Sequence, residues 1–157
     1  MKNKNSIALA ISLIIPQLAG GVGSLATAPN IGSWYEAIVK PSFNPPNFIF
    51  GPVWITLFAL MGIALYLVWK HGTGEGRRIA LTFFGIQLGL NVAWSFLFFA
   101  AHSPGLAFAE IIALWLAILA TAVSFWRVRR TAAWLLAPYL AWVSFAALLN
   151  FSIWQLN

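Results

Sequence analysis

Charged side chains are so scarce in this chain that they leave five long stretches able to cross a lipid bilayer as helices. Nine basic and three acidic residues are spread over 157 positions, and 61% of the residues are apolar. A helix needs about 20 residues to span the hydrocarbon core. The stretches that reach this length with at most one charge each are 5–26, 48–69, 79–101, 104–126 and 131–154. They are continuous runs of Leu, Ala, Ile and Phe, unlike the alternating segments of about 10 residues in membrane β-barrels. The sequence therefore predicts an all-α membrane protein with five transmembrane helices in one domain, 1–157.

The composition also excludes several classes of protein. An average soluble domain has about 25% charged residues, whereas this chain has 8%, which is too few to solvate a globular surface. An ordinary soluble enzyme, a disordered tail and a usual nucleic-acid binder are therefore excluded. The chain has no Cys, so disulfides and thiolate chemistry are absent. His71 and His102 each stand alone, and two isolated His residues predict no metal site.

The basic residues lie almost entirely on one side of the predicted topology. Five spans place the N-terminus and the connectors after the second and fourth spans on the same side. That side holds eight of the nine basic residues: Lys2, Lys4, Lys70, Arg77, Arg78, Arg127, Arg129 and Arg130. The other side holds only Lys40. Because positive charge stays in the cytoplasm, we expect the N-terminus inside and the C-terminus outside for a chain inserted into a bacterial cytoplasmic membrane. An outer-membrane location is left open.

The connectors differ in length and character. Residues 71–76 are expected to form a polar, Gly-rich loop, and residues 127–130 a short basic joint. The long connector 27–47 carries four prolines and is expected not to be helical.

The first span has a second interpretation. Lys2 and Lys4 followed by the apolar run 7–15 are similar to the start of a signal peptide. The apolar character continues past Pro16 to Leu25, which favours a complete span that is retained.

The spans contain few polar side chains that could take part in catalysis or ligand binding. Glu110 is the only carboxylate within a span, and a buried charge there is a functional candidate. Because it lies near the outer end of its span, we favour a side chain that snorkels, caps the helix or pairs with a loop group. No paired carboxylates or phosphate-binding loop indicate hydrolytic or phosphoryl-transfer catalysis.

Two opposite faces of the span 79–101 carry different residues. Gln87, Asn91 and Ser95 recur every four residues and share one face, where they could bind a ligand or hold neighbouring helices. A small-residue stripe lies about 200° away; it consists of Gly85, Gly89 and Ala93. Such a stripe allows close helix approach, within the monomer or in a homodimer.

Tryptophan is the most over-represented aromatic residue. Four of the nine lie near predicted span ends, where interfacial belts place them: Trp34, Trp69, Trp126 and Trp154. Four others lie within spans: Trp54, Trp94, Trp115 and Trp142. The internal set indicates either core packing and lipid contact or a flat aromatic ligand held between rings.

Several motifs, in order along almost the whole chain, resemble the translocator protein family, also called the tryptophan-rich sensory protein (TspO) or peripheral benzodiazepine receptor family. The motifs are Ser33-Trp34-Tyr35, Lys40-Pro41-Ser42-Phe43-Asn44-Pro45-Pro46, Phe50-Gly51-Pro52-Val53-Trp54, Leu90-Asn91-Val92-Ala93-Trp94-Ser95, Pro138-Tyr139-Leu140-Ala141-Trp142 and Leu149-Asn150-Phe151. The resemblance implies a bundle of five transmembrane helices, often a homodimer, whose pocket is closed by the Pro-rich loop between the first two helices. It also implies that the first helix is kept, in a bacterial-type member.

The function implied by the resemblance is an integral membrane protein that binds tetrapyrroles such as protoporphyrin IX and acts as a sensor or regulator in tetrapyrrole and stress responses. The same pocket would accept isoquinoline carboxamide and benzodiazepine-type drugs. The alternatives are a light-dependent porphyrin-degrading enzyme and a transporter of small amphipathic solutes. Porphyrin would be a ligand or substrate and not a covalently bound cofactor.

The resemblance also assigns residues. Trp54 and Trp142 would flank the ligand and would be the candidates for photochemistry. The rest of the pocket would be formed by Tyr35, Asn91, Trp94, Ser95 and Ala146, and the lid by Phe43, Pro45 and Pro46. The sterol-recognition pattern of animal members is not matched, because Phe151 replaces its Tyr and no Lys or Arg follows; this makes sterol binding doubtful.

Overall fold

The computed structural model describes the backbone of residues 2–157 and the side chains of residues 5–157, and this part of the chain is helical without any strand. Five long helices dominate: α1 (Lys2–Ile31), α3 (Asn47–His71), α4 (Gly74–Ser95), α5 (Pro104–Val128) and α7 (Ala137–Leu156). Three short elements lie between them: α2 (Trp34–Ala37), the π-helical turn η1 (Phe96–Ala100) and α6 (Arg130–Trp134).

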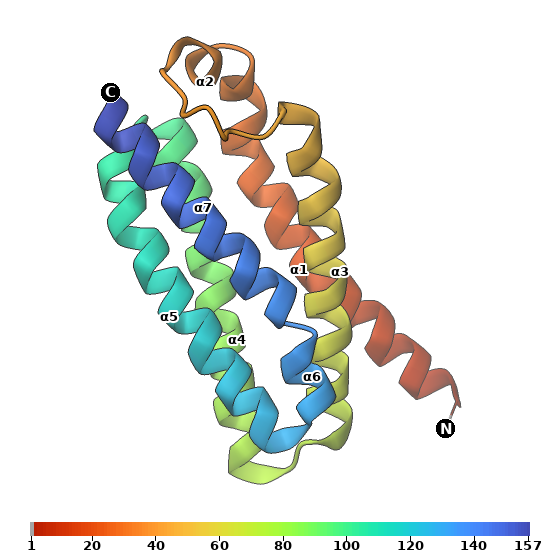
Figure 1. Cartoon of the computed structure of the whole chain (residues 1–157). Coiled ribbons are helices and arrows are strands. Elements are labelled where there is room, and N and C mark those ends of the chain that lie inside the picture. Colours follow the sequence, from red (N-terminus) through yellow and green to blue (C-terminus); the bar gives the residue numbers. More distant parts are fainter. Residues whose placement is uncertain (1) are drawn as a thin grey trace.

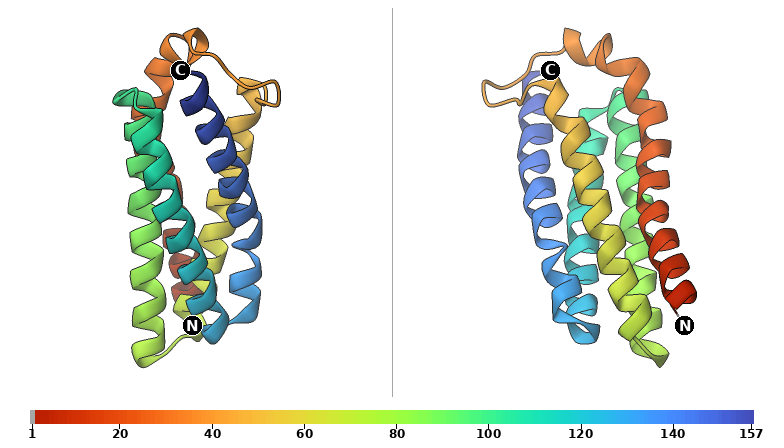
Figure 2. Two further views of the ribbon diagram at one scale, coloured as in Figure 1. Left: turned by 60° about the vertical axis from the view of Figure 1, so that its left-hand side comes forward. Right: turned by 90° about the vertical axis from the view of Figure 1, so that its right-hand side faces the viewer.

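The long helices form an elongated bundle, as Figures 1 and 2 show. Five segments are long and apolar enough to cross a membrane, namely 5–31, 47–71, 74–100, 104–128 and 130–156. The predicted five-helix membrane protein is therefore confirmed. One end of the bundle carries the N-terminus and the α3–α4 and α5–α6 connections, and we call it the basic end. The opposite end carries the C-terminus, α2 and the loop 38–46 (Figure 1).

The long connector is shorter than predicted, because α1 continues to Ile31 and α2 follows it. Pro29 removes one backbone N–H from the last turns of α1. Two side chains add hydrogen bonds to carbonyl groups of these turns: Asn30 donates to the carbonyl of Ala26 at 2.8 Å and Ser33 to that of Pro29 at 3.0 Å. The expectation that all of 27–47 lacks helix is therefore wrong.

The loop predicted at 71–76 is also mostly helical, because α3 continues to His71. Helix α4 begins at Gly74, whose φ of 52° lies in the left-handed region that favours glycine. Glu75 stands in the first turn, where a negative charge is favoured. Only two residues, Gly72 and Thr73, separate α3 from α4, so these two helices form a tight hairpin.

The fifth span is interrupted near its start. Helix α6 ends at Trp134 and α7 begins at Ala137. Pro138 has no N–H to donate to the preceding turn, and Leu135 and Leu136 form a turn in its place. The basic joint predicted at 127–130 is shorter in the structure, since only Arg129, between α5 and α6, is non-helical.

The apolar core is densest toward the basic end. Met61, Ala64 and Val68 of α3 are fully buried together with Ile118 and Phe125 of α5. Helices α1 and α3 approach closely, because a Cβ atom on Gly62 would stand 2.7 Å from the Cα atom of Leu13. This packed half supports the other half of the bundle, where the helices enclose a cavity.

Candidate functional site

A cavity of about 670 Å³ lies in the half of the bundle away from the basic end. Its size falls within the range of about 300–1,000 Å³ of ligand pockets. Its walls come from α1, α2, α3, α4, η1 and α7, whose arrangement can be followed in Figure 1. The structure brings together all the residues that the family resemblance assigned to the pocket: Tyr35, Trp54, Asn91, Trp94, Ser95, Trp142 and Ala146.

These residues reach the cavity from four elements. Tyr35 stands on α2, and Trp54 lies two turns into α3. Asn91 and Ser95 lie four residues apart on α4, and Trp142 and Ala146 are spaced in the same way on α7. Residues four apart share a helix face, so each helix presents two neighbouring wall positions to the same space.

The two central indoles are held by other aromatic rings. Trp54 stacks on Phe58 with ring centroids 5.4 Å apart and meets the edge of Tyr139 at 6.2 Å. Trp142 lies 6.0 Å from Phe50 and 5.6 Å from Phe145. Both indoles remain half-buried. The cavity therefore offers aromatic surface whose orientation is fixed by packing before any ligand arrives.

Three polar side chains of the wall already have partners. The Tyr35 hydroxyl donates to Asn44 Oδ1 at 2.8 Å, and Asn91 Nδ2 donates to the Tyr139 hydroxyl at 2.9 Å. The Trp94 indole N–H donates to Asn150 Oδ1 at 3.0 Å. These hydrogen bonds join helices or attach α2 to the following loop, so they shape the cavity.

Four other donor side chains of the cavity wall have no hydrogen-bond partner among the described residues, namely the exposed amide of Asn47 and three more. The indole N–H groups of Trp54 and Trp142 and the hydroxyl of Ser95 make no hydrogen bond to the part of the chain that the structure describes. All three side chains line the cavity. They are the groups best able to donate to acceptor atoms of a ligand.

Tyr35 remains a neutral phenol over the physiological pH range. Its side chain is buried, and burial raises the pKa of Tyr35 above its ordinary value of 10.0, while the hydrogen bond to Asn44 lowers it by a smaller amount. The Lys40 ammonium lies 4.9 Å from the centroid of the same ring and donates hydrogen bonds to the backbone carbonyls of Tyr35, Glu36 and Ile38. Lys40 thus stabilises the turn that carries Tyr35.

The predicted lid residues Phe43, Pro45 and Pro46 do not themselves line the cavity. Their loop crosses the end of the bundle between α2 and α3 (Figure 2). Phe43 reaches the wall indirectly, because its ring lies 6.4 Å from Phe145, which contacts Trp142. The loop is also attached to the C-terminal residue, since Val39 and Asn157 exchange two hydrogen bonds of 3.0 Å. A role of the loop as a lid stays a prediction.

Sequence reasoning missed the contribution of α1. Gly20, Gly21 and Gly23 line the cavity, and a Cβ atom on Gly23 would stand 3.0 Å from Ser95 Oγ. Small residues therefore let α1 approach the polar face of α4. The cluster of three glycines within one apolar span was the signal that could have indicated this wall.

Glu110 does not belong to the cavity, and the favoured interpretation of it is wrong. Both carboxylate oxygens are buried and have no hydrogen-bond partner among the residues that the structure describes. The side chain thus neither snorkels to the surface nor caps a helix, and no ion pair of residues 5–157 includes it.

The opposite faces of α4 have the predicted character. Gln87 and Asn91 are 1% and 6% exposed, whereas Gly85 and Gly89 lie on the exposed face. A Cβ atom on either glycine would meet nothing within 4 Å. These glycines therefore serve no close packing within the monomer, and a homodimer interface at Gly85, Gly89 and Ala93 stays a prediction.

Comparison with known proteins agrees with this architecture. The model of the TspO/MBR family matches residues 12–155. The tryptophan-rich protein TspO of Chlorobaculum tepidum is 45% identical over 157 residues, covering 99% of both chains. The protein of the same name from Archaeoglobus fulgidus is 42% identical, covering 98% of this chain and 99% of the relative. The human translocator protein is 40% identical over 146 residues, covering 92% of this chain and 86% of the relative.

Proposed function

Because the chain belongs to the TspO/MBR family, we propose that its cavity binds a tetrapyrrole of the protoporphyrin type and that the protein is a membrane receptor for it. At the level of the family, membership supports a membrane protein related to tetrapyrrole sensing or binding. The observation that carries the finer proposal is the pairing of Trp54 and Trp142 in one cavity of about 670 Å³, each with an unused indole N–H.

The chemistry of the cavity wall suits such a ligand. A porphyrin is a flat, apolar macrocycle with carboxylates at one edge. Indole and phenyl faces pack against the macrocycle, and the N–H groups of Trp54 and Trp142 and the hydroxyl of Ser95 can donate to the carboxylates. Isoquinoline carboxamide and benzodiazepine-type drugs, which also combine flat aromatic rings with a few acceptors, would compete for the same space.

Light-dependent degradation of the bound porphyrin is the second candidate function. It is favoured by the same two residues, because an indole beside a photoexcited porphyrin can donate an electron to it. The indole is thereby oxidised and the porphyrin reduced, and dissolved O2 would be the oxidant that takes up the electrons and opens the ring. In the receptor function the indoles only contact the ligand. The two candidates therefore predict the same binding site and differ only in the fate of the ligand.

The test is to titrate the purified protein with protoporphyrin IX in the dark and under illumination, and to follow the porphyrin absorbance. Saturable binding without product supports the receptor. Loss of more than one equivalent of porphyrin per protein supports the enzyme. A lack of saturable binding in the dark would contradict both functions.

A matched pair of variants strengthens the test. The double variant Trp54→Phe/Trp142→Phe keeps aromatic rings in the wall but removes both indoles. The control is Trp126→Phe, because Trp126 is 44% exposed and lies outside the cavity. The control should bind and degrade porphyrin like the parent. If the double variant does so as well, the two indoles have no part in either function.

The protein is an integral membrane protein, and we propose that its basic end faces the cytoplasm. The described side chains at that end include Lys70, Arg77, Arg78, Arg127, Arg129 and Arg130. Lys40 alone among the described basic residues lies at the other end. Positive charge is retained in the cytoplasm during insertion, so the cavity would lie in the outer half of a bacterial cytoplasmic membrane.

A further inference from the structure

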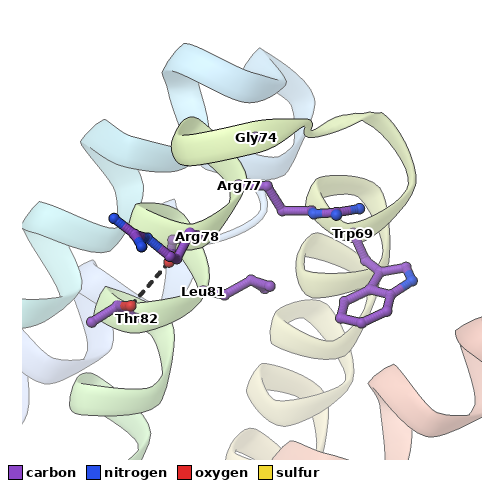
Figure 3. Close-up of a pocket in the computed structure, with 6 residues that line it drawn as sticks. All are labelled: Trp69, Gly74, Arg77, Arg78, Leu81 and Thr82. Atoms are coloured by element: carbon purple, nitrogen blue, oxygen red, sulfur yellow. Dashed lines mark hydrogen bonds between the residues drawn. The ribbon is translucent and has the colours of Figure 1, made fainter.

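A second pocket, of about 420 Å³, lies at the basic end, far from the aromatic cavity and between the end of α3 and the first turns of α4 (Figure 3). Its lining residues are Trp69, Gly74, Arg77, Arg78, Leu81 and Thr82. None of them lines the aromatic cavity. Two arginines, one indole and one aliphatic side chain therefore line the edge of two membrane-spanning segments, with the two guanidinium groups on different sides of the pocket.

Arg77 is held in place by the tight α3–α4 hairpin. A Cβ atom on Gly72 would stand 2.9 Å from the Cβ of Arg77 and 2.7 Å from the carbonyl oxygen of Val68, so only glycine permits this approach. The guanidinium carbon of Arg77 lies 5.6 Å from the Trp69 ring centroid, and Figure 3 shows the side chain reaching across to that ring. No carboxylate of residues 5–157 pairs with Arg77.

Arg78 contributes a second charge that is only weakly neutralised. Its guanidinium lies 3.7 Å from Glu75, and the two side chains are 79% and 76% exposed. Ion pairs this exposed are weak and open readily. In Figure 3, Arg78 extends away from Arg77, and Leu81 points into the space between α4 and α3. Thr82, which also lines the pocket, donates to the backbone carbonyl of Arg78 at 2.9 Å.

We propose that this pocket binds the phosphate-bearing headgroup of an anionic phospholipid. Guanidinium groups recognise phosphate oxygens through charge-assisted hydrogen bonds, and the positive end of the α4 dipole adds to the attraction. Arg77 and Arg78 provide this recognition at the level where two spanning helices leave the hydrocarbon, which is where lipid headgroups lie.

The apolar part of the pocket favours a lipid over a free anion. Trp69 is 53% exposed and has the character of an interfacial aromatic residue. Leu81 lines the pocket, and the neighbouring Ile79 is 43% exposed. These side chains offer an apolar surface to the glycerol and acyl part of a lipid that inorganic phosphate would leave unused.

The experiment measures lipid retention by native mass spectrometry after the purified protein is titrated with phosphatidylglycerol or phosphatidylcholine. The parent protein should retain phosphatidylglycerol in preference to phosphatidylcholine. The variant Arg77→Gln/Arg78→Gln should weaken the retention of phosphatidylglycerol by about tenfold or more, because two charge-assisted contacts are lost.

The control variant Arg127→Gln/Arg129→Gln removes the same charge from the same end but from residues outside the pocket. It should leave retention within about twofold of the parent, since exposed charges away from the headgroup contribute little. An equal loss in both variants would mean that only the net charge attracts lipid, which would overturn the proposal.

Two further arms keep the result decisive. Inorganic phosphate at millimolar concentration should not displace the lipid; displacement would assign the pocket to a free anion instead. If the double variant does not fold, as judged by circular dichroism and gel filtration, Arg78→Gln alone replaces it, because that side chain is 79% exposed and its loss should not disturb folding. Unchanged lipid retention by folded Arg78→Gln would then overturn the proposal.

Discussion

The side-chain amide of Asn91 donates a hydrogen bond of 2.9 Å to the hydroxyl oxygen of Tyr139, and both side chains are buried. This bond joins α4 to α7 directly beside the cavity, since Asn91 lines the wall and Tyr139 meets the edge of Trp54. One of the two N–H groups of the Asn91 amide is thus already occupied, and the first role of this side chain is to hold the wall in shape.

Tyr139→Phe should therefore destabilise the bundle, because the Asn91 amide would lose its acceptor while remaining buried. We expect a loss of about 0.6–2 kcal/mol in the free energy of unfolding, as for hydrogen bonds between membrane helices. Unfolding in mixed micelles of mild and denaturing detergent measures it. The control is Tyr66→Phe, because the half-buried Tyr66 hydroxyl makes no hydrogen bond to the described residues. Equal stability of the two variants would contradict the prediction.

Trp142→Ala should weaken porphyrin binding by about 1–3 kcal/mol, since it removes an aromatic wall of the cavity. The dissociation constant, measured by quenching of protein fluorescence, should rise accordingly. Trp134→Ala serves as the control, because Trp134 is 66% exposed and does not line the cavity. If Trp142→Ala binds porphyrin as tightly as the parent, the ligand does not contact this indole.

Asn150→Leu should destabilise the junction of three helices. Asn150 is 1% exposed, accepts from the Trp94 indole at 3.0 Å and donates to the Pro104 carbonyl at 2.7 Å. Leucine has a similar size but leaves both partners unsatisfied, at a cost of about 1–3 kcal/mol. Ser152→Ala on the same helix is the comparison, because its hydroxyl bonds only within α7. A thermal midpoint of Asn150→Leu no lower than that of Ser152→Ala would refute this role.

Gly89→Leu should convert a homodimer into monomers if the exposed stripe of α4 forms the interface. A Cβ atom at Gly89 meets nothing within 4 Å in the monomer, so the substitution should leave the fold intact and act only on a partner helix. Light scattering in mild detergent gives the molar mass. An unchanged dimer would remove the stripe from the interface. The control is Ile86→Leu, at a position on the same helix that is 49% exposed. It leaves the glycine stripe unchanged and should therefore leave the dimer intact.

A reporter fused after Asn157 should be found on the outer side of the cytoplasmic membrane. The prediction follows from an odd number of spans and from the basic residues gathered at the end opposite the C-terminus. Paired fusions of a periplasmic and a cytoplasmic reporter enzyme provide the measurement. Activity of the cytoplasmic reporter would reverse the proposed orientation.

Site residues could be predicted where an unusual residue type or a family motif marks them. Features of the site that depend on contacts between distant segments could not be predicted. Asn91 stood out as a polar residue within an apolar span, whereas the family resemblance selected Trp54 and Trp142 from the four tryptophans within spans. Glu110 stood out for the same reason, but its surroundings could not be read from its position in the span. The two oxygens are buried without a hydrogen-bond partner among the described residues, and such burial depends on how the helices pack.

The sequence by itself determined the number of spans and the side on which positive charge gathers. Both follow from local quantities, the length of an apolar run against the thickness of a bilayer and the positions of a few charges. Only the tertiary structure decided that α1 continues through Pro29, that Gly23 lets α1 reach Ser95, and that Trp94 is bonded to Asn150. The last two features arise between helices far apart in the chain, where close packing and the need of buried polar groups for partners select one arrangement.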